Sequence, residues 1–140
     1  MGELEDALKA MTERLGKKSV TEGNAVEEDS LAAGNFVVKN AIQYIEDYYN
    51  EKITLNKVAE MTYVSQWHLS KLLNKEEGKN FSEILNYIRI RHAKELLKDP
   101  AYRIADVAEL VGFADVAHFS RVFKKNEGIS ANEYRNTKIT

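Results

Sequence analysis

Two short segments of the chain carry polar, aromatic and cationic side chains at the spacing of one helix face. They are Gln66, Trp67, Ser70, Lys71, Asn74 and Lys75 in the first segment, and His118, Ser120, Arg121, Lys124 and Lys125 in the second. Such groups donate and accept directional hydrogen bonds and attract anions. On one helix they suit the major groove of duplex DNA, where base edges offer donors and acceptors between rows of phosphates.

The sequence does not support chemistry that makes or breaks bonds. There is no cysteine, which excludes a disulfide, a thiolate nucleophile and a cysteine-based zinc site. The three histidines, His68, His92 and His118, lack the spacing and the neighbouring carboxylates of a metal site. No G-x-S-x-G, Walker or H-E-x-x-H motif occurs in the sequence. We therefore expect a protein that is not an enzyme and that uses no metal or other cofactor.

The composition favours a helical protein outside the membrane. The 140 residues are 44% hydrophobic and 30% charged, with a single proline. This length suffices for one domain or two very small ones, and the residue usage predicts an all-α fold. No run of about 18 apolar residues occurs, and the start is acidic where a secretory signal is basic and then apolar. We expect a cytoplasmic protein with no membrane partner.

The net charge alone does not predict a nucleic-acid partner. It is −2 for the whole chain, and residues 1–35 hold eight acidic and four basic residues. Residues 36–140 hold fourteen acidic and sixteen basic residues. Any argument for DNA binding therefore depends on where the positive charges lie.

Residues 1–35 are predicted to form an amphipathic helix followed by a flexible linker. The apolar stripe of this helix consists of Leu4, Leu8, Met11 and Leu15. The stripe is short for a stable coiled coil, so a frayed remnant, or a helix that packs on something absent here, is favoured over a dimerisation segment, which stays an alternative. Residues 16–34 are rich in Gly, Ser, Asn and acidic residues and show no period, which is typical of a linker.

Two longer helices are predicted in the remaining chain. The first spans about 36–50, with Asn35 as its N-cap, and its apolar face consists of Val38, Ile42, Ile45 and Tyr49. The second spans about 81–98 and ends before Pro100. Its predicted buried residues are Ile84, Leu85, Ile88, Leu96 and Leu97. It also carries Arg89, Arg91 and Lys94, which form either a solvated face or phosphate contacts.

Two short helices are predicted over about 54–78. Thr54 and Ser65 are the expected N-caps, and Gly78 ends the pair in the left-handed conformation. The expected inward-facing residues are Leu55, Val58, Ala59, Met61, Leu69, Leu72 and Leu73.

A second pair of short helices is predicted over about 103–128. Asp115 or Ala114 opens its second helix, Gly128 ends it, and Gly112 serves the turn with a positive φ. The expected inward-facing residues are Ile104, Val107, Ala108, Leu110, Val111, Phe119, Val122 and Phe123. A last helix, which carries Tyr134, starts with a capping box formed by Ser130 and Glu133. Arg103 stands where a capping Ser or Thr is expected, at a cost of about 1 kcal/mol.

The two pairs are copies of one motif. The run "VAEMTYVSQWHLSK" aligns with "VAELVGFADVAHFSR" when one residue is inserted in the turn. Each copy is helix, short turn, helix, and the helix over 81–98 connects them. The predicted fold is all-α, with two helix-turn-helix subdomains joined by a long linker helix, seven helices in residues 36–140.

The second copy also carries a family resemblance. The run "GFADVAHFSRVFKKNEGISANEYR", residues 112–135, resembles the signature of the AraC/XylS-type transcriptional regulators, and "SQWHLSKLLNKEEG" resembles the first helix-turn-helix of that family. Ala131 replaces the usual proline of the signature. The resemblance covers about residues 36–135. It implies a seven-helix domain that binds double-stranded DNA, regulates transcription and has RNA polymerase as a partner.

The resemblance assigns roles to individual positions. It places base contacts at Gln66, Trp67, Ser70 and Lys71 of the first recognition helix, and at Val116, Ala117, Ser120 and Arg121 of the second. Contacts to the DNA backbone are expected from Ser65, Asn74, Lys75, His118, Lys124 and Lys125. Because Val116 and Ala117 can touch only thymine methyls or the backbone, the first helix is expected to carry more of the specificity.

Three interpretations stay open at the level of sequence. A helical protein-interaction module without DNA binding is the alternative to a DNA-binding regulator, since both the net charge and the N-terminal stripe agree with it. Trp67 is either a core residue or a DNA contact, and its place beside the apolar face favours DNA. The domain is either the output domain of a longer regulator, such as a two-component response regulator, or a regulator that stands alone.

Overall fold

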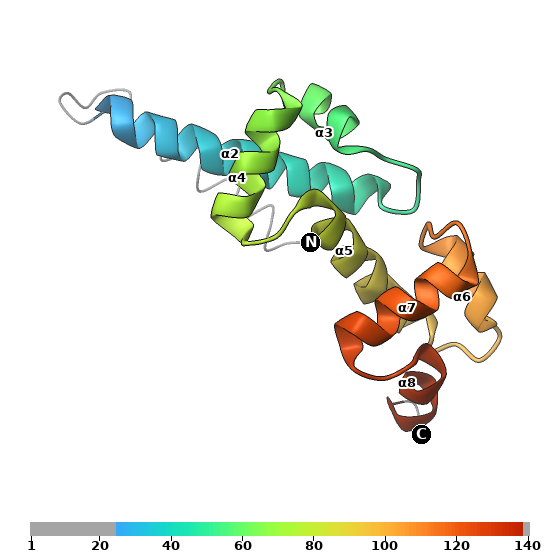
Figure 1. Cartoon of the computed structure of the whole chain (residues 1–140). Helices are drawn as coiled ribbons and strands as arrows, with labels where there is room; N and C mark the ends of the chain where they lie inside the picture. Colours follow the sequence, from blue (N-terminus) through green and yellow to red (C-terminus); the bar gives the residue numbers. More distant parts are fainter. Residues whose placement is uncertain (1–24, 139–140) are drawn as a thin grey trace. The chain divides into compact units, whose positions relative to one another are not determined.

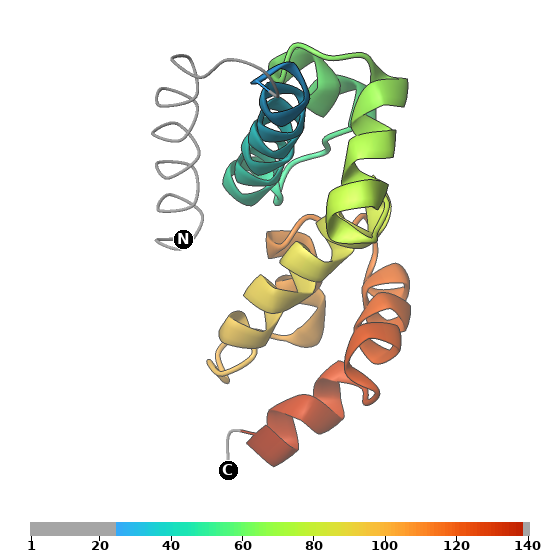
Figure 2. The same ribbon diagram turned by 90° about the vertical axis from the view of Figure 1, so that its left-hand side faces the viewer.

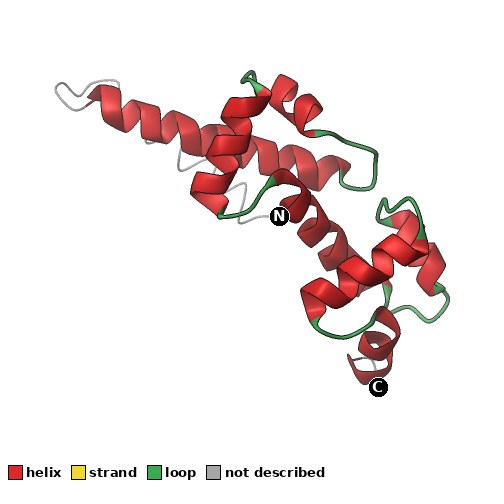
Figure 3. Ribbon diagram, viewed as in Figure 1, coloured by secondary structure: helices red, strands yellow, loops and turns green. Residues whose placement is uncertain are grey.

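The chain is all-α in the part that the structure describes. The structure is a computed structural model that describes residues 25–138, with the backbone alone for residues 25–32 and residue 138. Loops and helices make up this part, and it contains no strand (Figure 3). The helices are α2 (Ala25–Tyr48), α3 (Leu55–Met61), α4 (Gln66–Glu77), α5 (Phe81–Leu96), α6 (Ile104–Leu110), α7 (Val116–Glu127) and α8 (Ala131–Lys138) (Figure 1). Within these residues no helix is both long and apolar enough to cross a membrane.

The helix α2 begins well before the residue that the sequence indicated. It starts at Ala25 and runs to Tyr48 without a break, so the linker prediction is wrong for residues 25–34, and the expected domain boundary at residue 35 falls inside a helix. Alanine, leucine and glutamate dominate the start of α2 and are strong helix formers, and the single Gly34 costs only about 1 kcal/mol. Residues 16–24 and the predicted amphipathic helix before them lie outside the described residues.

The first compact unit contains the first helix-turn-helix. It takes in the chain up to Asp47 together with Thr54–Phe81, and α3 is joined to α4 by a tight turn (Figure 2). The side chains of Leu69 and Leu73 on α4 are fully buried, as predicted. The other buried apolar residues of the unit are Val38, Ala41, Ile42, Ile45, Val58 and Ala59.

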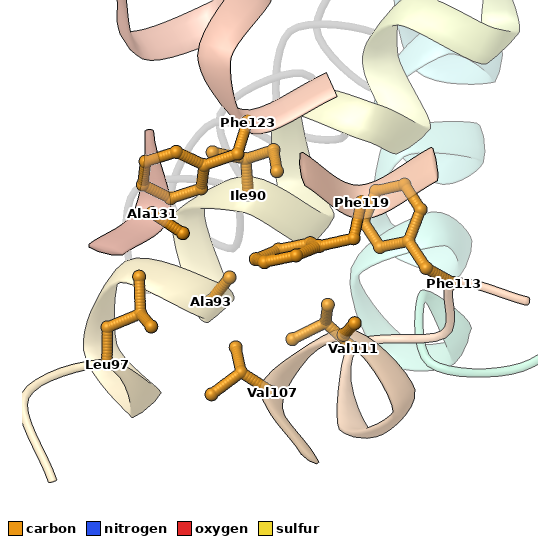
Figure 4. Packing of buried hydrophobic residues seen from close by; sticks show 10 residues of the cluster. Ile90, Ala93, Leu97, Val107, Val111, Phe113, Phe119, Phe123 and Ala131 are labelled. Carbon is orange, nitrogen blue, oxygen red and sulfur yellow. The ribbon is translucent and has the colours of Figure 1, made fainter. Parts of the chain in front are cut away.

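The second unit contains the second helix-turn-helix and a core of its own. It consists of Tyr48–Ile53 and the chain from Ser82 onward. In Figure 4, Phe119 and Phe123 of α7 lie in one cluster with Ile90 of α5. The rings of Phe119 and Phe123 have their centroids 5.7 Å apart. The other members of this core are Ala93, Leu97, Val107, Ala108, Val111, Phe113 and Ala131. Core packing therefore accounts for the phenylalanine stripe of α7.

Side-chain caps fix where the short helices begin. Thr54, Ser65 and Asp115 each accept a hydrogen bond from the backbone N–H three residues later, at 3.1, 3.0 and 2.7 Å. The capping box at the start of α8 is also confirmed, because Ser130 Oγ accepts from the Glu133 N–H and Glu133 Oε1 accepts from the Ser130 N–H. These local bonds satisfy N–H groups that the first helical turn leaves without partners.

Glycines with a positive φ end both α4 and α7. Gly78 after α4 has φ 68°, and Gly128 after α7 has φ 81°, as predicted. Gly112 in the turn before α7 has φ 100°, also as predicted. At the start of α6, Arg103 makes no side-chain cap, since its guanidinium has no acceptor, but its N–H donates to Asp106 Oδ2 at 2.9 Å. The missing cap is thus replaced in part.

Two predicted core residues lie at the surface. Met61 is 51% exposed and Leu110 is 47% exposed, so the inward assignment is wrong for both. They occupy equivalent places at the ends of α3 and α6. The next residue turns inward instead: Val111 in the second copy and Thr62 in the first. The Thr62 hydroxyl fits this buried place because it donates to the carbonyl oxygen of Val58 at 2.9 Å.

Arg89 of α5 is a structural residue. It is only 9% exposed; its Nε donates to the Tyr49 carbonyl oxygen at 2.8 Å and its Nη2 to that of Glu51 at 3.0 Å. Its guanidinium carbon lies 5.4 Å from the centroid of the Phe113 ring. Burial lowers the pKa of the Arg89 guanidinium from its usual value, yet an arginine remains protonated in proteins. Arg89 therefore belongs to no solvated face and makes no phosphate contact, the two roles expected from the sequence.

Candidate nucleic-acid interface

The helix α4 has a polar and basic face directed to solvent, and its opposite face packs in the core. Leu69 and Leu73 are buried, and the helix starts at the Ser65 cap, which together fix the rotation of α4 and leave one side in solvent. The predicted contact residues on this side are exposed, apart from the half-buried Ser70; they are Ser65, Gln66, Trp67, Lys71, Asn74 and Lys75.

Trp67 and Lys71 form a pair on this face. Trp67 is 67% exposed, which rules out the core position that the sequence left open. The Lys71 ammonium lies 4.5 Å from the centroid of the Trp67 ring, a cation–π contact worth about 0.5–1 kcal/mol at an exposed site. The ring therefore holds a positive charge near the middle of the face. One helical turn further on, Asn74 Nδ2 donates to the Ser70 carbonyl oxygen at 3.0 Å.

The outward face of α7 is built in the same way. Phe119 and Phe123 are fully buried, and the Asp115 cap fixes the start of the helix. All the predicted contact residues of this helix are exposed: Val116, Ala117, His118, Ser120, Arg121, Lys124 and Lys125. The His118 ring meets the Phe113 ring edge-on, with centroids 5.2 Å apart, so it packs on the turn while remaining accessible.

The two faces differ in chemistry where they begin. On α4 the first exposed side chains are Gln66 and Trp67, whereas on α7 they are Val116 and Ala117. The cap of α4, Ser65, is neutral, but the cap of α7 is the carboxylate of Asp115. A carboxylate stabilises the start of a helix and repels a phosphate there. The start of α4 is thus the better place for an anion and for polar contacts to bases.

Positive charge on α7 gathers at the other end of the helix. Lys124 and Lys125 lie in its last turn, where they interact favourably with the helix dipole. Nearby, Glu127 accepts from Lys94 of α5 at 3.1 Å, so Lys94 is partly engaged within the protein. Arg91, in contrast to Arg89, is exposed.

Comparison with known proteins identifies the family. A family model described as a helix-turn-helix domain matches residues 58–137, more than half of the chain. The C-terminal domain of AraT, a response regulator from Geobacillus stearothermophilus, is 38% identical with a TM-score of 0.70. The match covers 74% of this chain and 87% of that domain. The chain belongs to the AraC/XylS-type helix-turn-helix family.

Longer relatives of this AraC/XylS-type domain are transcriptional regulators by name. The HTH-type transcriptional regulator YijO of Escherichia coli is 40% identical over 92 residues, which cover 66% of this chain and 32% of YijO. The lactose operon transcription activator of Staphylococcus xylosus is 38% identical over 98 residues, 70% of this chain and 35% of the activator. The chain thus spans about a third of the length of these curated relatives.

Several structural features of this AraC/XylS-type domain were not foreseen from its sequence. Arg89 lies four residues after Leu85 and four before Ala93, both of which are buried, and that spacing was a usable sign of its burial. Tyr63 holds the turn between α3 and α4 with φ 62° and is 93% exposed. In the second copy Gly112 takes the equivalent place in the turn, so the alignment of the copies was the available signal for a strained residue at position 63.

Proposed function

We propose that this domain binds double-stranded DNA in a sequence-specific manner and regulates transcription, with α4 and α7 as recognition helices. Each helix enters a major groove with its outward face. One observation carries the proposal: on both helices the apolar side is buried and the predicted contact side chains, with the half-buried Ser70 as the exception, are exposed. The names of the regulators to which the chain is similar support the same function.

The two helices have different tasks in this proposal. The helix α4 provides most of the specificity through Gln66, Ser70 and Lys71, because polar contacts to bases discriminate by about 1–3 kcal/mol each. Trp67 adds an apolar contact and keeps the Lys71 ammonium on the outward face. The helix α7 provides affinity, since its Arg121 and the two lysines of its last turn suit phosphates, whereas Val116 and Ala117 cannot discriminate by hydrogen bonds.

Two alanine variants test the division of tasks. Lys71→Ala is expected to weaken binding to a selected site more than binding to a random duplex, because a base contact is lost. Lys124→Ala is expected to weaken binding to both duplexes by the same factor, because a phosphate contact is independent of sequence. Affinities are measured by fluorescence anisotropy with labelled duplexes at one fixed salt concentration. Equal losses for both variants on both duplexes would contradict the assignment.

A helical protein-interaction module without DNA binding is the competing function, supported by the net charge of −2. The salt dependence of duplex binding separates the two functions. Each neutralised phosphate steepens the fall of log K with log salt by about 0.9, and a module that binds only proteins shows no such dependence for DNA.

The arrangement on DNA and the larger assembly are part of the proposal. We infer that α4 and α7 enter consecutive major grooves, so that footprinting of a bound duplex yields two protected stretches about 10 base pairs apart. We also infer that the helix-turn-helix domain is the output part of a longer regulator, since AraT is a response regulator matched through its C-terminal domain. Contact with RNA polymerase is a further inference from the family.

A further inference from the structure

A groove in the first unit lies between the middle of α2, Val64 in the turn before α4, and one side of α4. Its volume is about 410 Å³, which is room for many water molecules. Its lining residues are Ala33, Gly34, Val37, Val64, His68, Leu72, Lys75 and Glu76. Of these residues, only Leu72 was predicted to lie in the core. Only Lys75 was predicted to contact DNA.

The floor of the groove is apolar and accessible. Val37, Val64 and Leu72 are each only half-buried, whereas Val38 on the next position of α2 is buried. Gly34 keeps the groove open, because a Cβ at this position would come within 3.2 Å of the Leu72 side chain. Leaving this apolar surface in water is unfavourable by about 25 cal/mol for each Å². The surface therefore favours an apolar partner.

The sequence of the chain supplies a partner of matching shape. Leu4, Leu8, Met11 and Leu15 follow one another at steps of four, three and four residues, which places them on one face of a helix about 18 Å long. A stripe of this kind requires an apolar surface, because an isolated helix of twelve residues is marginal in water.

The connection between the stripe and the groove has a suitable length. Nine residues separate Leu15 from Ala25, where α2 begins, and they span at most about 30 Å. The groove starts at Ala33, about 12 Å along α2 from Ala25. A helix over residues 4–15 can therefore return antiparallel to α2 and cover the groove without stretching the connection.

Charge permits the same pairing. Residues 1–15 carry four acidic side chains and two basic ones; the acidic residues are Glu3, Glu5, Asp6 and Glu13. The α4 side of the groove carries Lys75 and His68, with Glu76 as its one acidic residue. An acidic helix lying in the groove thus meets a lysine at its edge.

We propose that residues 4–15 of this chain dock as a helix in the groove between α2 and α4, with Leu8 and Met11 on Val37 and Leu72. Docking shields Lys75 from phosphates and so weakens DNA binding; this consequence rests on the proposed function. The segment is in this way an internal competitor of DNA for one edge of α4. The docking itself does not depend on whether the domain binds DNA.

The docking is tested without DNA, on the full chain and on the chain that lacks residues 1–15. Amide signals of Val37, Leu72 and Lys75 are expected to shift when residues 1–15 are removed, and those of Ile45 in the core are expected to stay in place. Leu8→Ser with Met11→Ser should reproduce the shifts, whereas the control Thr12→Ser, off the stripe, should not. Unchanged groove signals in the shortened chain would overturn the proposal.

Cross-linking separates docking within one chain from docking between two copies. Because the chain has no cysteine, Met11→Cys with Val37→Cys introduces one defined pair, and Met11→Cys with Asn56→Cys is a control at an exposed position of α3. Mild oxidation is expected to give a cross-linked monomer with the first pair and not with the control. A dimer-sized product from the first pair, appearing in place of the monomer, would overturn the proposal in favour of a second copy.

The effect on DNA is measured separately. The chain with Leu8→Ser and Met11→Ser is expected to bind duplex more tightly than the unchanged chain, with a fall of log K with log salt that is steeper by about 1, as for one additional lysine–phosphate contact. Tighter binding with the same salt slope would refute shielding of Lys75. If no variant binds DNA while the groove signals still shift, the proposed function fails and the docking stands.

Discussion

The turn between α6 and α7 has no room for a side chain at Gly112. A Cβ there would lie 2.8 Å from the carbonyl oxygen of Tyr49 and 3.1 Å from Nε of Arg89, and these two atoms are themselves hydrogen-bonded at 2.8 Å. The backbone also has φ 100° at this position, a conformation that is unfavourable for residues other than glycine. Gly112→Ala is therefore expected to strain the backbone and to disturb the buried guanidinium together.

The magnitude follows from three contributions. The positive φ costs about 1–2 kcal/mol, and forcing a methyl group against packed atoms costs about 1–3 kcal/mol. Alanine gives back about 0.4–1 kcal/mol by restricting the unfolded chain. We expect Gly112→Ala to lower the free energy of unfolding by about 2–4 kcal/mol.

Urea denaturation followed by far-ultraviolet circular dichroism measures this loss. Gly128→Ala is the matched control: its φ is 81°, but nothing lies within 4 Å of the added Cβ. It should lose only the backbone contribution, about 1 kcal/mol. Equal losses for Gly112→Ala and Gly128→Ala would refute the argument that close approach of Tyr49 and Arg89 sets the cost.

Two further predictions concern the buried arginine and the helix caps. Arg89→Met is expected to lower the free energy of unfolding by about 2–4 kcal/mol, because the carbonyl oxygens of Tyr49 and Glu51 lose a charged donor, while Arg121→Met at an exposed position of α7 should change it by less than about 0.5 kcal/mol; a loss shared by both would contradict the role of Arg89. Ser65→Asp keeps a good cap but adds a negative charge, so duplex affinity should fall at least about threefold, the effect of one unit charge about 6 Å from a phosphate in water. Asp115→Asn should raise affinity without changing stability, and anisotropy titrations that show no change for either cap variant would mean that no phosphate approaches these helix starts.

Much of the fold was predictable because its determinants are local. The caps at Thr54, Ser65 and Asp115 each act within three residues, so sequence alone could place them. Leu69, Leu73, Phe119 and Phe123 are buried as their helical spacing predicted. The outward faces of α4 and α7 follow directly, since a helix with one buried side leaves its other side in solvent.

The remaining features depend on contacts that are distant in sequence. Arg89 is about forty residues from the carbonyl groups that it holds, and no local pattern names those partners. Thr62 takes a buried place because its hydroxyl bonds to the preceding turn of α3, whereas the sequence favoured Met61 as the apolar residue there. The groove formed by α2 and α4 depends equally on how two helices pack, which the spacing of residues within either helix does not determine.

The salt dependence of duplex binding tests the central claim most directly. A duplex selected from a random pool by the full chain is titrated at a series of salt concentrations, beside a random duplex of equal length. With three to five cations of α4 and α7 on phosphates, log K should fall linearly with log salt with a slope of roughly −3 to −4.5, and the selected duplex should bind more tightly throughout. A slope near zero, or equal affinities for the two duplexes, would contradict the account.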